Sequence, residues 1–217
     1  MKIIQKYCIL MLTIITICQS QTFSEFGIKM GMVSSKCEIN LLSQVGGSGT
    51  IFNARRNGPT MGIYVRYFDF KFFNIESELY YLQKGGEDKM ELSTISQPDG
   101  TGEFLIFDIH FDCLQFQTSF RPYINFKKID LYGIIGGTLN YLIGVRNGFS
   151  PKNDFKDFLL GHSIGLGVVF HDVFNKTILI EMLINSDINN IYSSTNVKCK
   201  TSFYMLRVGF SLYDLTK

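Results

Sequence analysis

Apolar and polar side chains alternate with a period of two along most of the chain after residue 21. A strand with two unlike faces has this period, because successive side chains point to opposite sides of a sheet. Between Phe158 and Phe170, for example, Leu160 and Leu166 alternate with Gly161 and Gly167. The pattern predicts eight strands, at residues 25–32, 59–68, 72–83, 104–121, 129–143, 157–170, 176–188 and 200–213.

The expected connections alternate in length along the chain. Polar stretches rich in Gly, Asn, Ser and Asp cover residues 35–58, 84–103, 144–156 and 189–199, and short links lie near residues 69–71, 122–128 and 171–175. Long loops at one end and tight turns at the other are typical of outer-membrane barrels, with the turns in the periplasm. A change of phase near Asp112 additionally predicts a β-bulge in the fourth strand.

The first twenty residues have the pattern of a secretory signal peptide. Two lysines precede an apolar run at Ile9–Ile17, and Cys18–Ser20 supplies the small residues that a signal peptidase reads. The run is shorter than the ~20 residues of a membrane-spanning helix. We therefore expect residues 1–20 to be removed and residues 21–217 to form one barrel domain, with no membrane helix in it.

The polar face of the alternation distinguishes a membrane barrel from a soluble one. A water-facing exterior would be rich in Lys, Glu and Asp, whereas this face carries mainly Gly, Ser, Thr, Asn, Gln and Tyr. Lumen glycines are expected at 27, 31, 62, 136, 161, 165, 167 and 209. The sequence thus predicts an all-β fold, an eight-stranded antiparallel up-and-down transmembrane β-barrel whose apolar face meets lipid. Aromatic girdles are expected at Tyr67, Phe73, Tyr81, Phe120, Tyr141, Phe158, Phe170, Tyr204 and Tyr213.

Eight charged residues fall on the predicted lumen face. They are Glu25, Lys29, Arg66, Glu76, Glu78, Arg121, Glu181 and Arg207. Four acids and four bases can pair inside the barrel, and they should do so because an isolated buried charge costs roughly several kcal/mol. We expect a structural charge network that fills the lumen. Glu76 and Glu78 share a face, and we interpret them as partners of lumen arginines rather than as a carboxylate pair for catalysis.

A family resemblance lies in five stretches of the sequence, namely residues 27–31, 62–84, 112–122, 131–142 and 203–212. These stretches resemble, in the expected order, strands of the PorT-like outer-membrane β-barrel family of the Bacteroidetes. The loops and Cys113 depart from the family pattern. The resemblance implies an eight-stranded outer-membrane barrel. Some members serve protein secretion or gliding-related export, and the resemblance implies no catalytic or binding residues.

Residues with reactive side chains are few and scattered. His162 and Ser163 are adjacent, so on a strand they point to opposite faces and cannot form a direct dyad. His110 and Asp112 share a face, and His171 precedes Asp172 in a predicted turn, but a third metal ligand is not visible beside either pair.

Of the cysteines, Cys37, Cys113 and Cys199 would remain after export. They do not have the spacing of a disulfide framework or of a metal site. The sequence leaves open whether Cys37 and Cys199, both placed in loops, form a disulfide bridge.

The expected function is a structural or partner-binding role, without enzymatic activity or a cofactor. Partners would be outer-membrane lipid and a protein bound through loops or periplasmic turns. No small-molecule substrate is evident. A net charge of +2 is too small to indicate a surface that binds nucleic acid. Eight strands leave an interior just wide enough for side chains, which disfavours a wide pore. The alternatives are a lipid-modifying outer-membrane enzyme and a soluble periplasmic carrier of lipocalin type.

Overall fold

The computed structural model describes residues 23–42, 48–51, 54–68, 70–91, 104–146, 155–173, 176–191 and 197–214. The predicted signal peptide lies outside these residues. The described strands are β1 (Phe23–Leu42), β2 (Ser48–Ile51), β3 (Arg56–Tyr67), β4 (Phe73–Glu91), β5 (Phe104–Phe126), β6 (Ile129–Arg146), β7 (Phe158–Val173), β8 (Lys176–Asp187) and β9 (Val197–Asp214). Within these ranges no helix is long and apolar enough to cross a membrane.

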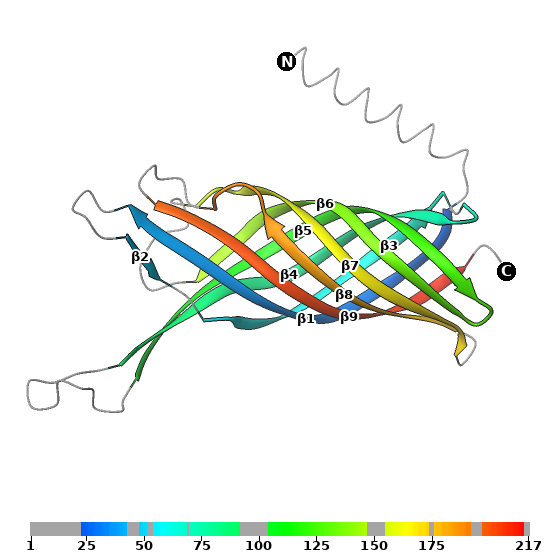
Figure 1. Ribbon diagram of the computed structural model, residues 1–217, viewed down its shortest axis with the longest axis horizontal. Helices are drawn as coiled ribbons and strands as arrows, with labels where there is room; N and C mark the ends of the chain where they lie inside the picture. Colours follow the sequence, from blue (N-terminus) through cyan, green and yellow to red (C-terminus); the bar gives the residue numbers. More distant parts are fainter. Residues whose placement is uncertain are drawn as a thin grey trace, which may run out of the picture.

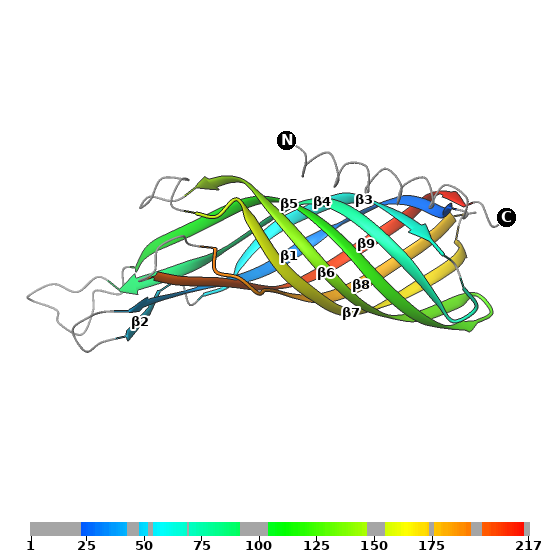
Figure 2. The ribbon, with the colours of Figure 1, turned by 90° about the horizontal axis from the view of Figure 1, so that it is seen from above.

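The strands form a closed barrel (Figure 1). Neighbours in sequence pair antiparallel from β3 to β9, and β1 pairs with both β3 and β9, which closes the wall. Strand β2 pairs only with the end of β1, so in the described part of the chain eight strands make the wall. Seen from above, the strands run obliquely around the barrel (Figure 2). This confirms the predicted eight-stranded antiparallel barrel.

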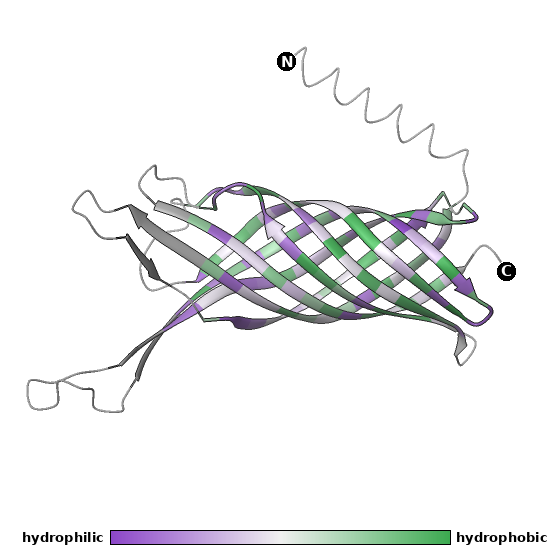
Figure 3. Ribbon diagram, viewed as in Figure 1, coloured by the Kyte–Doolittle hydropathy of each residue, from purple (hydrophilic) through white to green (hydrophobic). Residues whose placement is uncertain are grey.

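The outer face of the wall is apolar and the inner face of one half of the barrel is polar. Leu166 is 72% exposed and Met61 63% exposed, although both are fully apolar side chains. Glu76 and Arg121, in contrast, are completely buried. Hydrophobic residues are spread over the middle of the barrel, and hydrophilic ones are frequent near its ends (Figure 3). An apolar exterior over a closed hydrogen-bonded wall is the arrangement that a bilayer requires.

The predicted girdle residues are half-buried or exposed, and strand pairing divides them between the two ends of the barrel. Near the short turns lie Tyr67, Phe73, Phe120, Phe170 and Tyr213. Toward the long connections lie Tyr81, Tyr141, Phe158 and Tyr204. Phe73 and Phe120 pack with ring centroids 4.9 Å apart, and Tyr141 and Phe158 with centroids 5.0 Å apart. The two groups flank the apolar belt, as aromatic girdles do.

Several strands are longer than the sequence pattern predicts. Strand β1 continues to Leu42 and β4 to Glu91, into regions expected to be loops, and β5 continues to Phe126. Beyond the belt both faces of a strand can be polar, so hydrophobic alternation disappears while the hydrogen-bonded ladder persists.

The bulge predicted in β5 lies instead on the neighbouring strand. Asp112 pairs with Gly144 but Cys113 pairs with Leu142, so the additional residue is Ile143 of β6. The alternation of inward and outward side chains in β5 is uninterrupted, because Phe111, Cys113 and Gln115 are all buried. The apparent change of phase arises because the inward residues change from apolar to polar along β5.

Half of the lumen is apolar, which the sequence reading did not anticipate. Toward the long connections the interior is filled by buried side chains, namely Val33, Leu82, Phe111, Leu142, Leu159, Phe203 and Met205. The expected charge network therefore fills only the half of the lumen near the short turns, and apolar side chains fill the other half. The lumen has two layers, a charged layer near the short turns and an apolar layer beyond it.

Candidate functional site: the charged layer of the lumen

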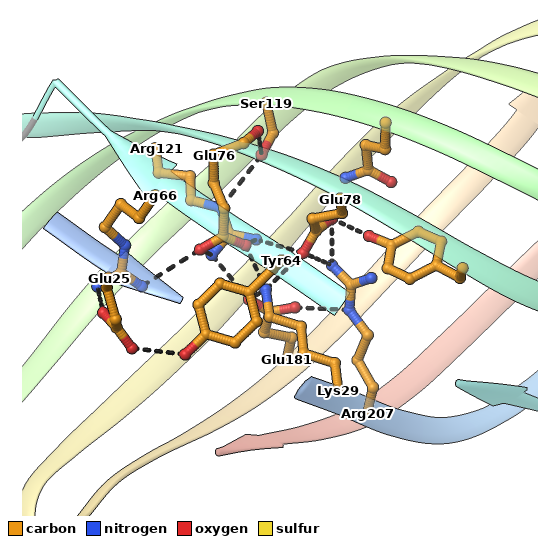
Figure 4. Close-up of polar contacts among 12 residues, drawn as sticks. Glu25, Lys29, Tyr64, Arg66, Glu76, Glu78, Ser119, Arg121, Glu181 and Arg207 are labelled. Carbon is orange, nitrogen blue, oxygen red and sulfur yellow. Dashed lines mark hydrogen bonds and ion pairs between the residues drawn. The ribbon is translucent and has the colours of Figure 1, made fainter. Parts of the chain in front are cut away.

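The eight residues of the predicted network come from six strands and meet in the lumen (Figure 4). Six of them form a tight core, which consists of Lys29, Glu76, Glu78, Arg121, Glu181 and Arg207. Their side chains are at most 1% exposed. Glu25 and Arg66 lie at the edge of this core, toward the short turns, and Arg66 is 11% exposed.

The Lys29 ammonium lies at the centre of the core (Figure 4). It donates to Glu76, to Glu78 Oε1 at 2.5 Å and to Glu181 Oε1 at 2.8 Å. An ammonium has three N–H donors, so these carboxylates account for all of them. One lysine thus joins β1 to β4 and β8.

The arginines complete the pairing of the three acids. Arg121 Nη2 lies 2.6 Å from Glu76 Oε1 and 3.1 Å from Glu78 Oε1, and Arg121 Nη1 lies 2.9 Å from Glu181 Oε1. Arg207 Nε donates to Glu181 Oε2 at 2.6 Å, and Arg207 Nη2 to Glu78 Oε1 at 3.0 Å. Three acids face three bases, so the core carries no net formal charge.

Arg66 links the core to its edge. It pairs with Glu25, and its Nη2 lies 3.3 Å from Glu76 Oε2. This peripheral acid–base pair is also neutral in sum. All eight charges of the predicted network are therefore matched within one cluster.

Three tyrosines support three of the glutamates, and sequence reasoning did not assign them this role. Tyr64 donates to Glu25 Oε1 at 2.5 Å and Tyr132 to Glu181 Oε1 at 2.7 Å. Tyr80 donates to Glu78. Each ring also lies beside a base: Lys29 Nζ is 4.5 Å from the Tyr64 centroid, Arg207 Cζ 4.7 Å from Tyr80 and Arg121 Cζ 5.2 Å from Tyr132.

Glycines on adjacent strands make room for these rings. Tyr64 is paired with Gly27, Tyr80 with Gly62 and Tyr132 with Gly167. A Cβ at any of the three glycines would collide with the ring of its partner. Tyr on one strand opposite Gly on the next was the sequence signal that could have identified this support.

In this arrangement all three carboxylates of the core are engaged in ion pairs, and none is free for catalysis or for binding a metal ion. Oxygens of Glu76, Glu78 and Glu181 lie within 4.8 Å of one another, a spacing that could hold a metal ion. Those oxygens already contact Lys29, Arg121 and Arg207, and a divalent cation would have to displace these bases. The cluster is a closed set of ion pairs that ties opposite parts of the wall together.

A second buried ion pair lies in the apolar layer and was missed from the sequence. Lys84 Nζ donates to Asp187 Oδ2 at 2.6 Å, and both side chains are at most 1% exposed. Asn140 Nδ2 donates to Asp187 Oδ1 at 3.1 Å, and the Thr201 hydroxyl also donates to this carboxylate. Lys84 had been placed at the start of a loop, which hid its inward position.

The reactive residues considered from the sequence do not assemble into a site. Ser163 is buried in the lumen, whereas His162 on the same strand is exposed on the outer face. This geometry provides no dyad for lipid modification. The apolar exterior likewise removes the basis for a lipocalin-like carrier, whose apolar face would line the interior.

The other two histidines contact Asp108 and Asp130. His110 contacts Asp108, and Asp112 instead accepts from the Tyr81 hydroxyl at 2.8 Å. His171 lies in β7 and contacts Asp130 Oδ2 at 2.8 Å, across the ladder rather than along the turn. The His171 contact joins β7 to β6, because cross-strand neighbours are closer than adjacent residues on opposite faces of a strand, and the His110 contact joins residues two apart on one face of β5.

A polar cavity of about 220 Å³ opens at the short-turn end of the lumen. Arg66 and Arg121 line it together with Asp130 and His171. The guanidinium of Arg121 belongs to the ion-pair core, so the cavity meets the charged layer there.

A closed eight-stranded wall, an apolar belt and a lumen packed with side chains, which are polar and charged in the half near the short turns, define a small outer-membrane β-barrel. Solved structures support this fold. The outer membrane protein OprG from Pseudomonas aeruginosa is 13% identical with a TM-score of 0.50, covering 89% of this chain and 98% of that one.

Two further matches are of lower structural similarity. Neisserial surface protein A is 14% identical with a TM-score of 0.47, covering 87% of this chain and 98% of that one. Ail, the attachment invasion locus protein of Yersinia pestis, is 14% identical with a TM-score of 0.41, and the match covers 88% of this chain and 100% of that one. No family model matches the chain, and a search of curated proteins found no match.

Proposed function

We propose that this protein is a non-conducting, non-enzymatic scaffold of the outer membrane that binds a protein partner at one end of its barrel. The observation that carries the proposal is the filled lumen. The charged layer spans the interior from β1 to β4 and β8, and Leu82, Phe111 and Phe203 fill the layer beyond it. Ions would have to break several buried ion pairs in order to pass.

The β4–β5 hairpin is the surface that we assign to the partner. Its ladder continues to Glu91 opposite Phe104, whereas the β3–β4 ladder ends at Leu82 and the β5–β6 ladder at His110. The hairpin consequently extends past the rest of the wall (Figure 1). Beyond the isolated bridge from Ala54 to Glu87, its edges can accept an added strand.

A planar-bilayer recording tests whether the lumen is closed. Purified protein, shown to be folded by its heat-modifiable gel mobility, should insert without stable conductance steps. A large, long-lived conductance would overturn the proposal, because the ion-pair core would then have to open.

Crosslinking in native envelopes tests the partner surface. A photo-crosslinking residue at Asp108, which is exposed on the hairpin, should give a protein adduct. The matched position is Leu166, which faces the lipid belt and should give none. Equal adducts at both positions, or none at Asp108, would count against the hairpin as a docking surface.

The resemblance to PorT-like barrels supports a link to protein secretion as the finer form of this proposal. A deletion strain with unchanged secreted proteins would remove that link and leave the scaffold role standing. The proposal also includes export, with residues 1–20 cleaved as a signal peptide. Sequencing of the mature N-terminus tests this, and we expect it to begin at Gln21.

A further inference from the structure

Two cysteines meet at the seam where the first and last strands of the wall join. Cys37 lies on β1 and Cys199 on β9, so both are in strands rather than in the loops predicted from sequence. In the register of the seam, Cys37 is opposite Thr201 and Cys199 is opposite Ile39, which makes the two cysteines diagonal neighbours. Their sulfur atoms are 2.7 Å apart as free thiols.

We propose that Cys37 and Cys199 form a disulfide in the native protein and thereby close the barrel seam covalently. A disulfide bond is about 2.0 Å long, so the sulfurs need to approach by only about 0.7 Å. Both side chains are fully buried and point at each other inside the lumen. The inference rests on export, because disulfides form in the periplasm and not in a reducing cytosol.

The oxidation balances with a protein disulfide of the periplasm as the oxidant. One cysteine thiolate attacks that disulfide and forms a mixed disulfide, releasing one thiol of the oxidant. The second cysteine thiolate then attacks the mixed disulfide, so the Cys37–Cys199 bond forms and the oxidant leaves as a dithiol. The oxidant has gained two electrons, and the protons of the two cysteines have passed to it or to water.

Burial determines when this exchange takes place. In the closed barrel neither sulfur is exposed, so an oxidant cannot reach them. The bond must form before or while β9 meets β1, and once formed it should be shielded from reductants. Cys113 stands on β5, separated from the seam by β3 and β4, and we expect it to stay a thiol.

The bond would act on the step that completes the barrel. The seam joins residues 162 positions apart, and its ladder runs from Glu25–Asp214 to Leu41–Val197. Cys37 and Cys199 lie near the far end of that ladder, away from the chain ends. A covalent tie there would prevent β9 from separating from β1 at the end that carries the long connections.

Thiol counting in acid-quenched, denatured protein from native envelopes tests the inference. The mature wild type should bind one equivalent of alkylating reagent, C113S none, and C37S two. Mass spectrometry of the unreduced wild type should recover a peptide pair joined at Cys37 and Cys199. Three reactive thiols in the wild type, or a pair that includes Cys113, would overturn it.

A gel without reductant provides a second readout. The unfolded wild type and C113S should run faster than their reduced forms, because the large loop stays closed, and C199S should not change with reductant. If C37S and C199S fail to assemble, C113S alone still decides the question. No mobility difference between its oxidised and reduced forms would contradict the bond, whatever the conductance measurement shows about the scaffold role.

Discussion

Lys84 and Asp187 are joined across the lumen at 2.6 Å, although they lie 103 positions apart in the sequence. Lys84 is on β4 and Asp187 on β8. These two strands are separated by β5, β6 and β7 in one direction around the wall, and by β3, β1 and β9 in the other. The pair therefore ties opposite sides of the barrel to each other within its apolar layer.

Asp187→Asn should destabilise the barrel by ~3–5 kcal/mol, because it leaves the Lys84 ammonium buried without its counter-charge. Urea unfolding in lipid vesicles measures this as a lower midpoint. The double variant Lys84→Met with Asp187→Leu should recover most of the loss, since neither position then carries a buried charge. A loss below about 1 kcal/mol for Asp187→Asn would show that water reaches Lys84 in the folded barrel.

Arg146 and Asp112 provide an exposed ion pair for comparison. Their atoms Nη2 and Oδ2 are 3.1 Å apart on the outer face, and Arg146 is 65% exposed. Arg146→Met should cost less than about 1 kcal/mol in the same urea experiment, because water screens an exposed pair. If it cost as much as Asp187→Asn, burial would not be what distinguishes the two ion pairs.

The strands within the membrane could be predicted because each residue there has only two environments, lipid or lumen. Leu160 and Ile164 had to face outward, and Ser163 inward, once alternation was recognised. Beyond the belt this constraint ends, so the continuation of β1 to Leu42 and of β4 to Glu91 was not visible.

The lumen charges could be enumerated but their partners could not. Facing follows from alternation, whereas the contact of Lys29 with both Glu76 and Glu181 depends on barrel diameter and strand stagger. Lys84 and Asp187 were missed for a related reason. Apolar inward neighbours such as Leu82 and Leu183 made that part of the lumen resemble the outer face.

Gly62→Ala should destabilise the barrel by ~1–3 kcal/mol through overpacking. A Cβ at Gly62 would lie 2.6 Å from Tyr80 Cδ1 and would also clash with the Leu79 carbonyl oxygen. Displacing Tyr80 would disturb its contacts with Glu78 and Arg207. Heat-modifiable mobility should show unfolding at a lower temperature.

Gly137→Ala is the matched control for this substitution. A Cβ at Gly137 would have no atom within 4 Å, and the residue also lies within a barrel strand. Its stability should change by no more than about 0.5 kcal/mol. Equal effects of the two alanines would mean that strand glycines matter for backbone entropy rather than for space beneath the tyrosines.

Ile164→Arg tests where the bilayer lies on the outer face. Ile164 is 58% exposed and lies between the girdle residues Phe158 and Phe170 of the same strand. A charge at the bilayer midplane of a barrel costs ~2–4 kcal/mol, and unfolding in lipid vesicles should show a loss of that size. Ser202→Arg is the control, because Ser202 is exposed on β9 beyond Tyr204 and should lose at most about 1 kcal/mol there. A small, equal loss at both positions would place the apolar belt in water, and the barrel would then need another apolar partner to cover it.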